Sequence, residues 1–224
     1  SHGIKLASPA HSAGQSYTLK FPTGNVTADK FLKVSSVSGS GTTGIGQLSF
    51  DDAGGGSYNL LSTTTISSGT TNVDITSNID STYKKYHISL INIHPSSDAS
   101  LRMRVFHSSS IYDSSGYRYC LERFRSNDAN SSDVSTGNYM PISYDPVGNQ
   151  NDESMWGEIQ LYDPSNTTFD KIIDFDGIVF DDEARTCHLY VANTMQSTNA
   201  INGVRFYWST GTFDSGTIKL YGVS

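Results

Sequence analysis

The chain has 224 residues and a formal net charge of −7, with 36% hydrophobic and 17% charged residues. The acidic balance excludes the fold-wide basic surface that nucleic-acid binding needs, and no apolar run reaches the roughly 18–20 residues of a membrane span. The 13 tyrosines and 10 phenylalanines are too many for a disordered chain. Such a composition suits half-buried β-sheets with a polar surface.

The first part of the chain, residues 15–56, is poor in apolar residues. It contains strand-like pieces at Tyr17–Pro22, Phe31–Val34 and Gln47–Phe50, and the stretch SSVSGSGTTGIG between the last two is nearly all glycine, serine and threonine. One such chain has too little apolar surface to offset an ordering entropy of about 1–2 kcal/mol per residue. Three copies around an axis could cover one another's apolar faces. The segment is therefore either a flexible linker or a stalk ordered by threefold association.

The second part, residues 57–224, has the period-two alternation that is typical of strands. One short helix of one or two turns is a candidate at Ile79–Tyr86, with Asp80 or Ser81 as its cap. The clearest strands are predicted at Tyr86–Ile93, Leu101–His107, Tyr117–Arg125, Met155–Leu161, Cys187–Val191 and Val204–Trp208.

The chain ends in a predicted hairpin-like pair, VRFYWS and TIKLYGV, joined by TGTFDSG. Turn-rich clusters separate the earlier strands. Regularly spaced strands with such turns predict an all-β fold, with a jelly-roll-like β-sandwich at residues 57–224. Two cysteines, Cys120 and Cys187, make no disulfide framework. We expect free thiols, with a disulfide between them as the alternative.

Motifs for catalysis are missing from the sequence. The histidines form no metal-binding pair, and there is no G-x-S-x-G elbow, P-loop or dinucleotide fingerprint. Asp152 or Glu153 with Glu158 could form a glycosidase pair, although any acidic protein offers such pairs. We therefore predict no enzyme, no cofactor and no metal.

Charge is unevenly distributed along the chain. Residues 101–125 carry five arginines and two acids, whereas residues 126–183 carry thirteen acids and one base. Solvated faces with cross-strand or intersubunit ion pairs explain this pattern. Alternatively, Arg102 and Arg104, which share one strand face, meet an acidic glycan or an acidic neighbouring subunit. A third reading is a calcium site at Asp181–Glu183 or around Asp145–Glu153, without EF-hand spacing.

Several aromatic residues fall in or beside turns. An exposed ring there stacks on the C–H surface of a sugar, whereas a buried ring fills the sandwich and its edges. From the exposed aromatic and arginine positions we take six candidate ligand-binding residues: Tyr112, Tyr117, Tyr144, Trp156, Arg102 and Arg104.

The chain resembles bacteriophage tail-fibre and other virion fibre proteins, particularly those of marine phages. The N-terminal resemblance rests on Ile4–Pro9, Ser16–Pro22, Phe31–Val34 and Gly46–Phe50, with Phe21 and Phe50 where leucine and tryptophan are usual. The C-terminal resemblance rests on Ile79–Ile88, Asn92–Pro95, Leu101–Val105 and the ending SGTIKLYG. Together they span residues 4–222.

This resemblance implies a homotrimer with a jelly-roll-like terminal domain on a thin stalk, and no catalytic residues. Residues 1–14 would dock on other virion proteins of the tail or capsid, residues 15–56 would form an intertwined β stalk, and residues 57–224 would form the head. The expected location is the surface of a virion made in the bacterial cytoplasm, with host-surface polysaccharide as a partner. The expected trimer interface comprises Leu19, Phe21, Leu32, Val34, Leu48 and Phe50.

Two other functions stay open at this point. One is a monomeric carbohydrate-binding β-sandwich, with tyrosine and tryptophan near the turns as a platform. The other is a polysaccharide depolymerase or esterase, which would need two carboxylates in a groove or a serine–histidine pair.

Overall fold

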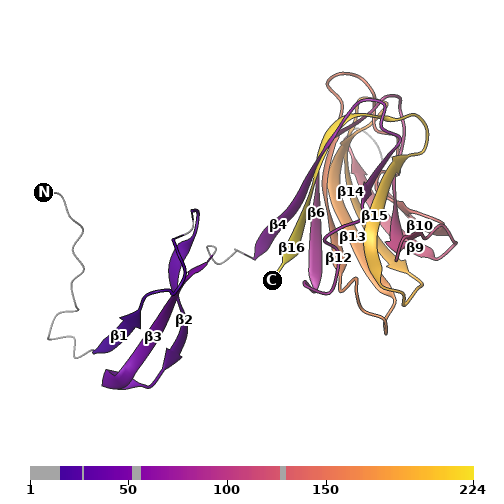
Figure 1. Cartoon of the computed structure of the whole chain (residues 1–224). Coiled ribbons are helices and arrows are strands. Elements are labelled where there is room, and N and C mark those ends of the chain that lie inside the picture. Colours follow the sequence, from indigo (N-terminus) through magenta and orange to yellow (C-terminus); the bar gives the residue numbers. More distant parts are fainter. Residues whose placement is uncertain (1–15, 27, 52–56, 127–129) are drawn as a thin grey trace, which may run out of the picture. The chain divides into compact units, whose positions relative to one another are not determined.

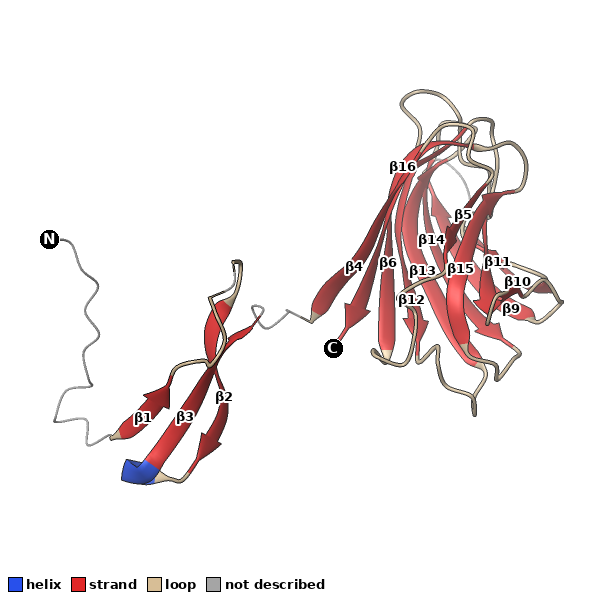
Figure 2. Cartoon of the chain, in the orientation of Figure 1, coloured by secondary structure: helices blue, strands red, loops and turns tan. Residues whose placement is uncertain are grey.

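The computed structural model is all-β and describes residues 16–26, 28–51, 57–126 and 130–224 (Figure 1). Within these ranges the helical content is a single 3₁₀ turn at Gly41–Thr43 (Figure 2). The chain divides into two compact units, Ser1–Gly56 and Ser57–Ser224. The expected docking segment, residues 1–14, lies outside the described residues.

The first unit contains a three-stranded sheet. Its strands are β1 (Tyr17–Lys20), β2 (Phe31–Ser38) and β3 (Gly44–Asp51), in the order β1-β3-β2. Strand β1 runs parallel to β3, and β2 is antiparallel to it. Every residue of β1 and β2 is exposed, so this sheet forms almost no core within the chain.

The glycine- and serine-rich stretch forms the end of β2, the start of β3 and, at residues 39–43, the connection between them. Gly39 and Gly41 adopt φ angles of 73° and 55°, a region that favours glycine. A Cβ on Gly39 would lie 2.5 Å from the carbonyl oxygen of Thr43. The N–H of Thr43 donates to the carbonyl of Ser40 at 3.1 Å. The glycines of residues 39–43 therefore serve a tight turn between paired strands.

The second unit is a β-sandwich, as the sequence predicted. One sheet has eight strands in the order β10-β9-β14-β13-β12-β6-β16-β4. Their bounds are β4 Tyr58–Ile66, β6 Lys85–Pro95, β9 Tyr117–Arg125, β10 Ser131–Gly137, β12 Met155–Tyr162, β13 Lys171–Phe180, β14 Thr186–Met195 and β16 Phe213–Val223.

The other sheet has the order β11-β7-β15-β5, with β8 paired to β7. Its strands are β5 Asn72–Ile75, β7 Leu101–His107, β8 Ser110–Ile111, β11 Met140–Pro141 and β15 Ile201–Trp208. Every strand pairing in this unit is antiparallel among the described residues. The chain passes between the two sheets several times, so residues distant in sequence meet in the core.

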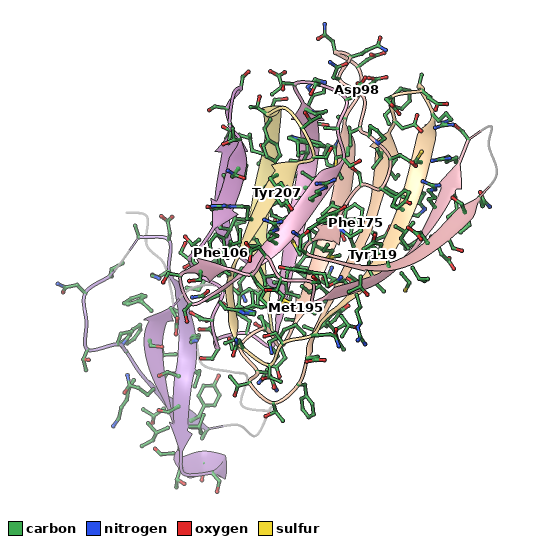
Figure 3. The ribbon with its side chains drawn as sticks, turned by 90° about the vertical axis from the view of Figure 1, so that its right-hand side faces the viewer. Asp98, Phe106, Tyr119, Phe175, Met195 and Tyr207 are labelled. Atoms are coloured by element: carbon green, nitrogen blue, oxygen red, sulfur yellow. The ribbon has the colours of Figure 1, made fainter. Side chains whose placement is uncertain are left out.

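Alternating side chains of both sheets form one core. Leu101, Met103 and Val105 of β7 are fully buried, which confirms the predicted inward face of that strand. They pack with side chains of the opposite sheet, including Phe175 and Met195 (Figure 3). The thiol of Cys187 is buried in this core, while Cys120 is exposed, and both are free.

Two sequence predictions about local structure are wrong. The last two strands do not form a hairpin: β15 pairs with β5 and β7, whereas β16 lies between β6 and β4 in the other sheet. The chain crosses between layers at Phe213, whose buried ring packs 5.3 Å from that of Trp208. β15 and β16 supply buried side chains from opposite sheets of the sandwich. A hairpin that paired them in one sheet would leave the other sheet without its strand.

The candidate helix at residues 79–86 is also absent. Asp80 Oδ1 accepts a hydrogen bond from the Thr82 N–H at 2.8 Å, and the hydroxyl of Tyr86 lies 3.1 Å from the same oxygen. This aspartate turn competes with a helix. Tyr86 meanwhile belongs to β6 and is fully buried. Residues 79–84 therefore form a loop that leads into β6.

Candidate functional site

The two arginines predicted to bind a ligand lie on the outer face of the five-stranded sheet. The guanidinium of Arg102 sits 4.3 Å from the ring centre of Tyr139. That of Arg104 sits 5.2 Å from the ring centre of Tyr207, and its Nε donates to the carbonyl of Asn138 at 2.9 Å. Cation–π contacts thus hold both side chains in place, and Arg104 has a backbone acceptor in addition.

The four predicted aromatic residues do not form one site. Tyr117 is fully buried, and its hydroxyl accepts from the Val105 N–H at 2.9 Å and donates to the Tyr112 carbonyl at 3.0 Å. Burial raises the pKa of this phenol above its ordinary value. The prediction of an exposed ligand-binding ring is therefore wrong for Tyr117. Tyr112 packs against it, with ring centres 5.5 Å apart.

Tyr144 borders a buried ion-pair cluster at one end of the sandwich, where Arg123 lies over its ring. Both oxygens of Asp145 are held there, by Arg123 Nη1 at 2.6 Å and Arg125 Nη2 at 2.5 Å. Arg185 Nε binds Asp181 Oδ2 at 2.9 Å, and the Cys187 thiol donates to the same oxygen at 3.3 Å. The cluster connects β9, β14 and the loops around them.

This cluster bears on the expected calcium site. Ligand atoms of Asp145, Asp181 and Cys187 lie within 4.8 Å of one another. However, three guanidinium groups already bind the two carboxylates, and Ca²⁺ requires several uncompensated oxygen ligands. Burial raises the pKa of Cys187 to about 12, so the thiol is protonated at neutral pH. The arrangement fits a structural ion-pair network better than a cation site.

Trp156 lies elsewhere, on the outer face of the eight-stranded sheet. Large apolar side chains gather on this face, which we call the outer sheet face. The exposed ones are Tyr58, Leu60, Phe124, Val134, Trp156, Tyr162, Ile172, Ile178 and Tyr190.

Strand register arranges the middle of the outer sheet face in rows. Trp156 on β12 is the cross-strand partner of Ile178 on β13, which in turn faces His188 on β14. In the neighbouring row Glu158 is opposite Asp176, and Asp176 is opposite Tyr190. An aromatic and apolar row thus runs beside an acidic one.

The acidic row has an unusual feature, because like charges directly opposite one another destabilise a sheet. Histidines flank the pair: His188 Nε2 lies 2.7 Å from Asp176 Oδ1, and His87 Nε2 lies 3.8 Å from Glu158 Oε1.

The acids that the sequence offered as partners of Glu158, Asp152 and Glu153, are not its cross-strand partners. Glu153 is buried, and its Oε2 accepts from the Gln150 N–H at 2.8 Å.

Hollows follow these rows. One of about 370 Å³ is bordered by Trp156, Ile178 and His188, and a second of about 380 Å³ by Asp174 and Tyr190; Glu158 and Asp176 border both. We call the two together the β12–β14 trough. Each hollow falls in the range of about 300–1,000 Å³ that is typical of small-molecule sites.

Beneath the trough the floor is backbone. Gly157 and Gly177 are cross-strand partners, and a Cβ on either would meet the Phe175 ring below, at 2.2 Å and 2.3 Å. The ring of Phe175, labelled in Figure 3, therefore covers the glycine pair from the core side.

Sequence reasoning found Trp156 but missed Asp176, His188 and Tyr190. The alternation in KIIDFDGIVF carried the missing signal, since it places Asp174, Asp176 and Ile178 on one face of a strand. Which strands lie beside that one depends on non-local pairing, and the sequence does not reveal it.

In the part of the chain that the structure describes, no helix has the length and apolar character to cross a membrane. Comparisons with known proteins give no match to the chain, whether among family models, curated proteins or solved structures.

Proposed function

We propose that the chain is a structural fibre protein of a bacteriophage particle, without enzymatic activity. Residues 17–51 belong to a stalk shared by three copies, and residues 57–224 form a head that faces the host or decorates the capsid. One observation carries the proposal: all residues of β1 and β2 are exposed, although many of them are large and apolar.

Four residues of the interface expected from the sequence, Leu19, Phe21, Leu32 and Val34, are exposed within one chain, which supports the proposal. A lone sheet that buries so little does not offset its ordering entropy. Three copies would supply the missing layer around an axis. Leu48 differs, because it is already buried within one chain, and its contribution to a trimer is correspondingly smaller.

The placement on a virion rests on the resemblance to phage fibre proteins, which covers both units. A glycine-rich turn between exposed strands, followed by a compact sandwich, suits a thin support for a distal head. Labelling intact particles with antibodies against residues 57–224 tests this placement. Particles that carry the protein internally, or not at all, would contradict it.

Light scattering on the size-exclusion peak of the full chain tests the oligomeric state, and an unboiled gel lane tests resistance to detergent. We expect a trimer. A monomer at micromolar concentration overturns the stalk and leaves a monomeric binding module as the better reading.

A matched pair of variants locates the interface. Phe21 in the first unit is 63% exposed, and Phe169 in the second is 70% exposed. Phe21→Glu should convert the trimer to monomer, because it introduces a charge into the shared apolar layer. Phe169→Glu should leave the trimer intact. Equal behaviour of the two variants would contradict an interface at the first unit.

A further inference from the structure

The β12–β14 trough has the chemistry of a sugar site. Its two exposed rings, Trp156 and Tyr190, lie on strands β12 and β14, with β13 between them. The indole N–H of Trp156 donates to Asn92 Oδ1, so one edge of the ring is tied to the neighbouring strand while the ring itself is 50% exposed. Fixed aromatic rings beside polar groups are well suited to stack on sugar C–H surfaces at low entropic cost.

The polar groups of the trough specify the charge of the ligand. Glu158 and Asp176 lie opposite each other, and Asp174 follows on the same face of β13, where it accepts from the Tyr162 hydroxyl at 2.8 Å. Ionised carboxylates only accept hydrogen bonds. Donor groups of a ligand therefore suit these carboxylates, beside the contacts that His188 and His87 already make with them. A hydroxyl or ammonium group between Glu158 and Asp176 would lessen their repulsion. A sulfate or uronic acid would add to it.

We propose that the β12–β14 trough binds a non-acidic saccharide. Trp156 and Tyr190 provide stacking surfaces, and Glu158 and Asp176 accept hydrogen bonds from hydroxyl or ammonium groups of the sugar. The proposal rests on the proposed function only for its setting, as the host-binding surface of a fibre head. It differs from an acidic glycan at Arg102 and Arg104, whose guanidinium groups stack on Tyr139 and Tyr207 instead.

The chain carries its own probe for the test. It has two tryptophans: Trp156 is half exposed, whereas Trp208 is 4% exposed. Acrylamide quenching of the assembled full-length protein should therefore report on Trp156. Strong quenching, lost in Trp156→Phe, means that the trough is open. Protection of Trp156 in the oligomer means that a neighbouring copy covers this face, and it overturns the proposal.

Binding is measured on a printed array of bacterial surface glycans with neutral, amino-bearing and acidic members, followed by fluorescence titration of the full chain. We expect neutral or amino-bearing members to bind, and a preference between them distinguishes hydroxyl from ammonium recognition. Trp156→Ala and Asp176→Asn should each weaken binding about tenfold. Phe169→Ala, an exposed ring away from the trough, should leave it unchanged.

Binding to no member of the array, a preference for acidic glycans, or unchanged affinity in well-folded Trp156→Ala overturns the proposal. Light scattering tests the fibre proposal separately. A monomer that binds through the trough leaves this site in place and removes the stalk. A trimer that binds no glycan keeps the stalk and removes this site.

Discussion

The two units of the chain use apolar side chains in opposite ways. In residues 57–224 alternate strand positions point into one core, and Phe206 and Phe213 are fully buried there. In the first unit, residues of the same type remain exposed: Phe31 on β2, and Phe21 just after β1. Among the described residues no second layer covers this sheet.

A sheet gains stability from the layer that covers it, and the head supplies that layer from its own chain. The strands of the first unit pair correctly, and Gln47 even bonds to the carbonyls of Phe21 and Leu48 at 3.1 and 2.9 Å. Hydrogen bonds contribute little net stability without apolar burial. Strands thus pair within one chain in both units, whereas an extensive apolar core forms only in residues 57–224.

The largest expected difference comes from replacing a phenylalanine by alanine in each of the two units. Phe206→Ala should cost about 3–5 kcal/mol of the free energy of unfolding of the head, because it leaves a cavity in the core. Phe31→Ala, at a 62% exposed position in the first unit, should change the free energy of unfolding of residues 57–224 by less than about 0.5 kcal/mol. Urea unfolding followed by the fluorescence of buried Trp208 measures both. Similar losses for the two variants would erase the contrast between the units.

A comparable effect is expected at the buried ion-pair cluster. Asp145→Ala removes the carboxylate that binds both Arg123 and Arg125 in a largely buried site, at a cost of about 3–5 kcal/mol. The control is Lys84→Ala, which breaks the exposed pair with Asp163 and should cost no more than about 1 kcal/mol. Thermal unfolding distinguishes the two. A cost below about 1 kcal/mol for Asp145→Ala would mean that the cluster is not structural.

Local sequence patterns predicted the fold class well, because they report which side of a strand is buried. The alternation in LRMRVFH placed Leu101 and Met103 inward and Arg102 outward, as the structure has them. Tyr117 shows the limit of such patterns. It stands beside a turn, like an exposed ring, but it is buried because β9 lies in the eight-stranded sheet and its hydroxyl reaches Val105 in the other.

The candidate site was harder to predict, because it is built by neighbours that are distant in sequence. Asp176 lies opposite Glu158, eighteen positions away, and Tyr190 lies opposite Asp176. Sequence proximity instead suggested Glu153 as the partner of Glu158. The same reason explains the wrong hairpin at the C-terminus, since local pattern gives strands but not the sheet that each strand joins.

A smaller effect is expected from the hydroxyl of Tyr117. Tyr117→Phe keeps the ring in the core but leaves the Val105 N–H without its acceptor, which should cost about 1–3 kcal/mol. Tyr190→Phe removes a hydroxyl from an exposed position and should be nearly neutral for unfolding. Denaturant midpoints at constant m-value decide the comparison. A neutral Tyr117→Phe would mean that water or a local shift replaces the bond.

The smallest expected effect is a pH dependence that belongs to the head alone. Burial by itself would raise the pKa of Asp181, but hydrogen bonds from Arg185, Cys187 and the Glu183 N–H outweigh it and lower the pKa below its ordinary value of 3.8. Since the folded pKa is the lower one, this stabilisation is complete above pH 3.8 and is lost as the pH falls through the folded pKa. Asp182 acts in the opposite sense, because burial and the charge of Asp181 raise its pKa.

Free energies of unfolding measured between pH 7 and pH 2 for the wild type and Asp181→Asn separate these contributions. The wild type should lose its advantage over the variant only below about pH 4, because the pKa of Asp181 lies below 3.8 in the folded protein. Parallel curves would contradict the role of Asp181. The ion pair of Lys33 and Asp51 in the first unit is about half exposed on both sides and therefore contributes little. Acid should thus weaken residues 57–224 through Asp181 and leave the sheet of the first unit, which has no buried carboxylate in its described strands, far less affected.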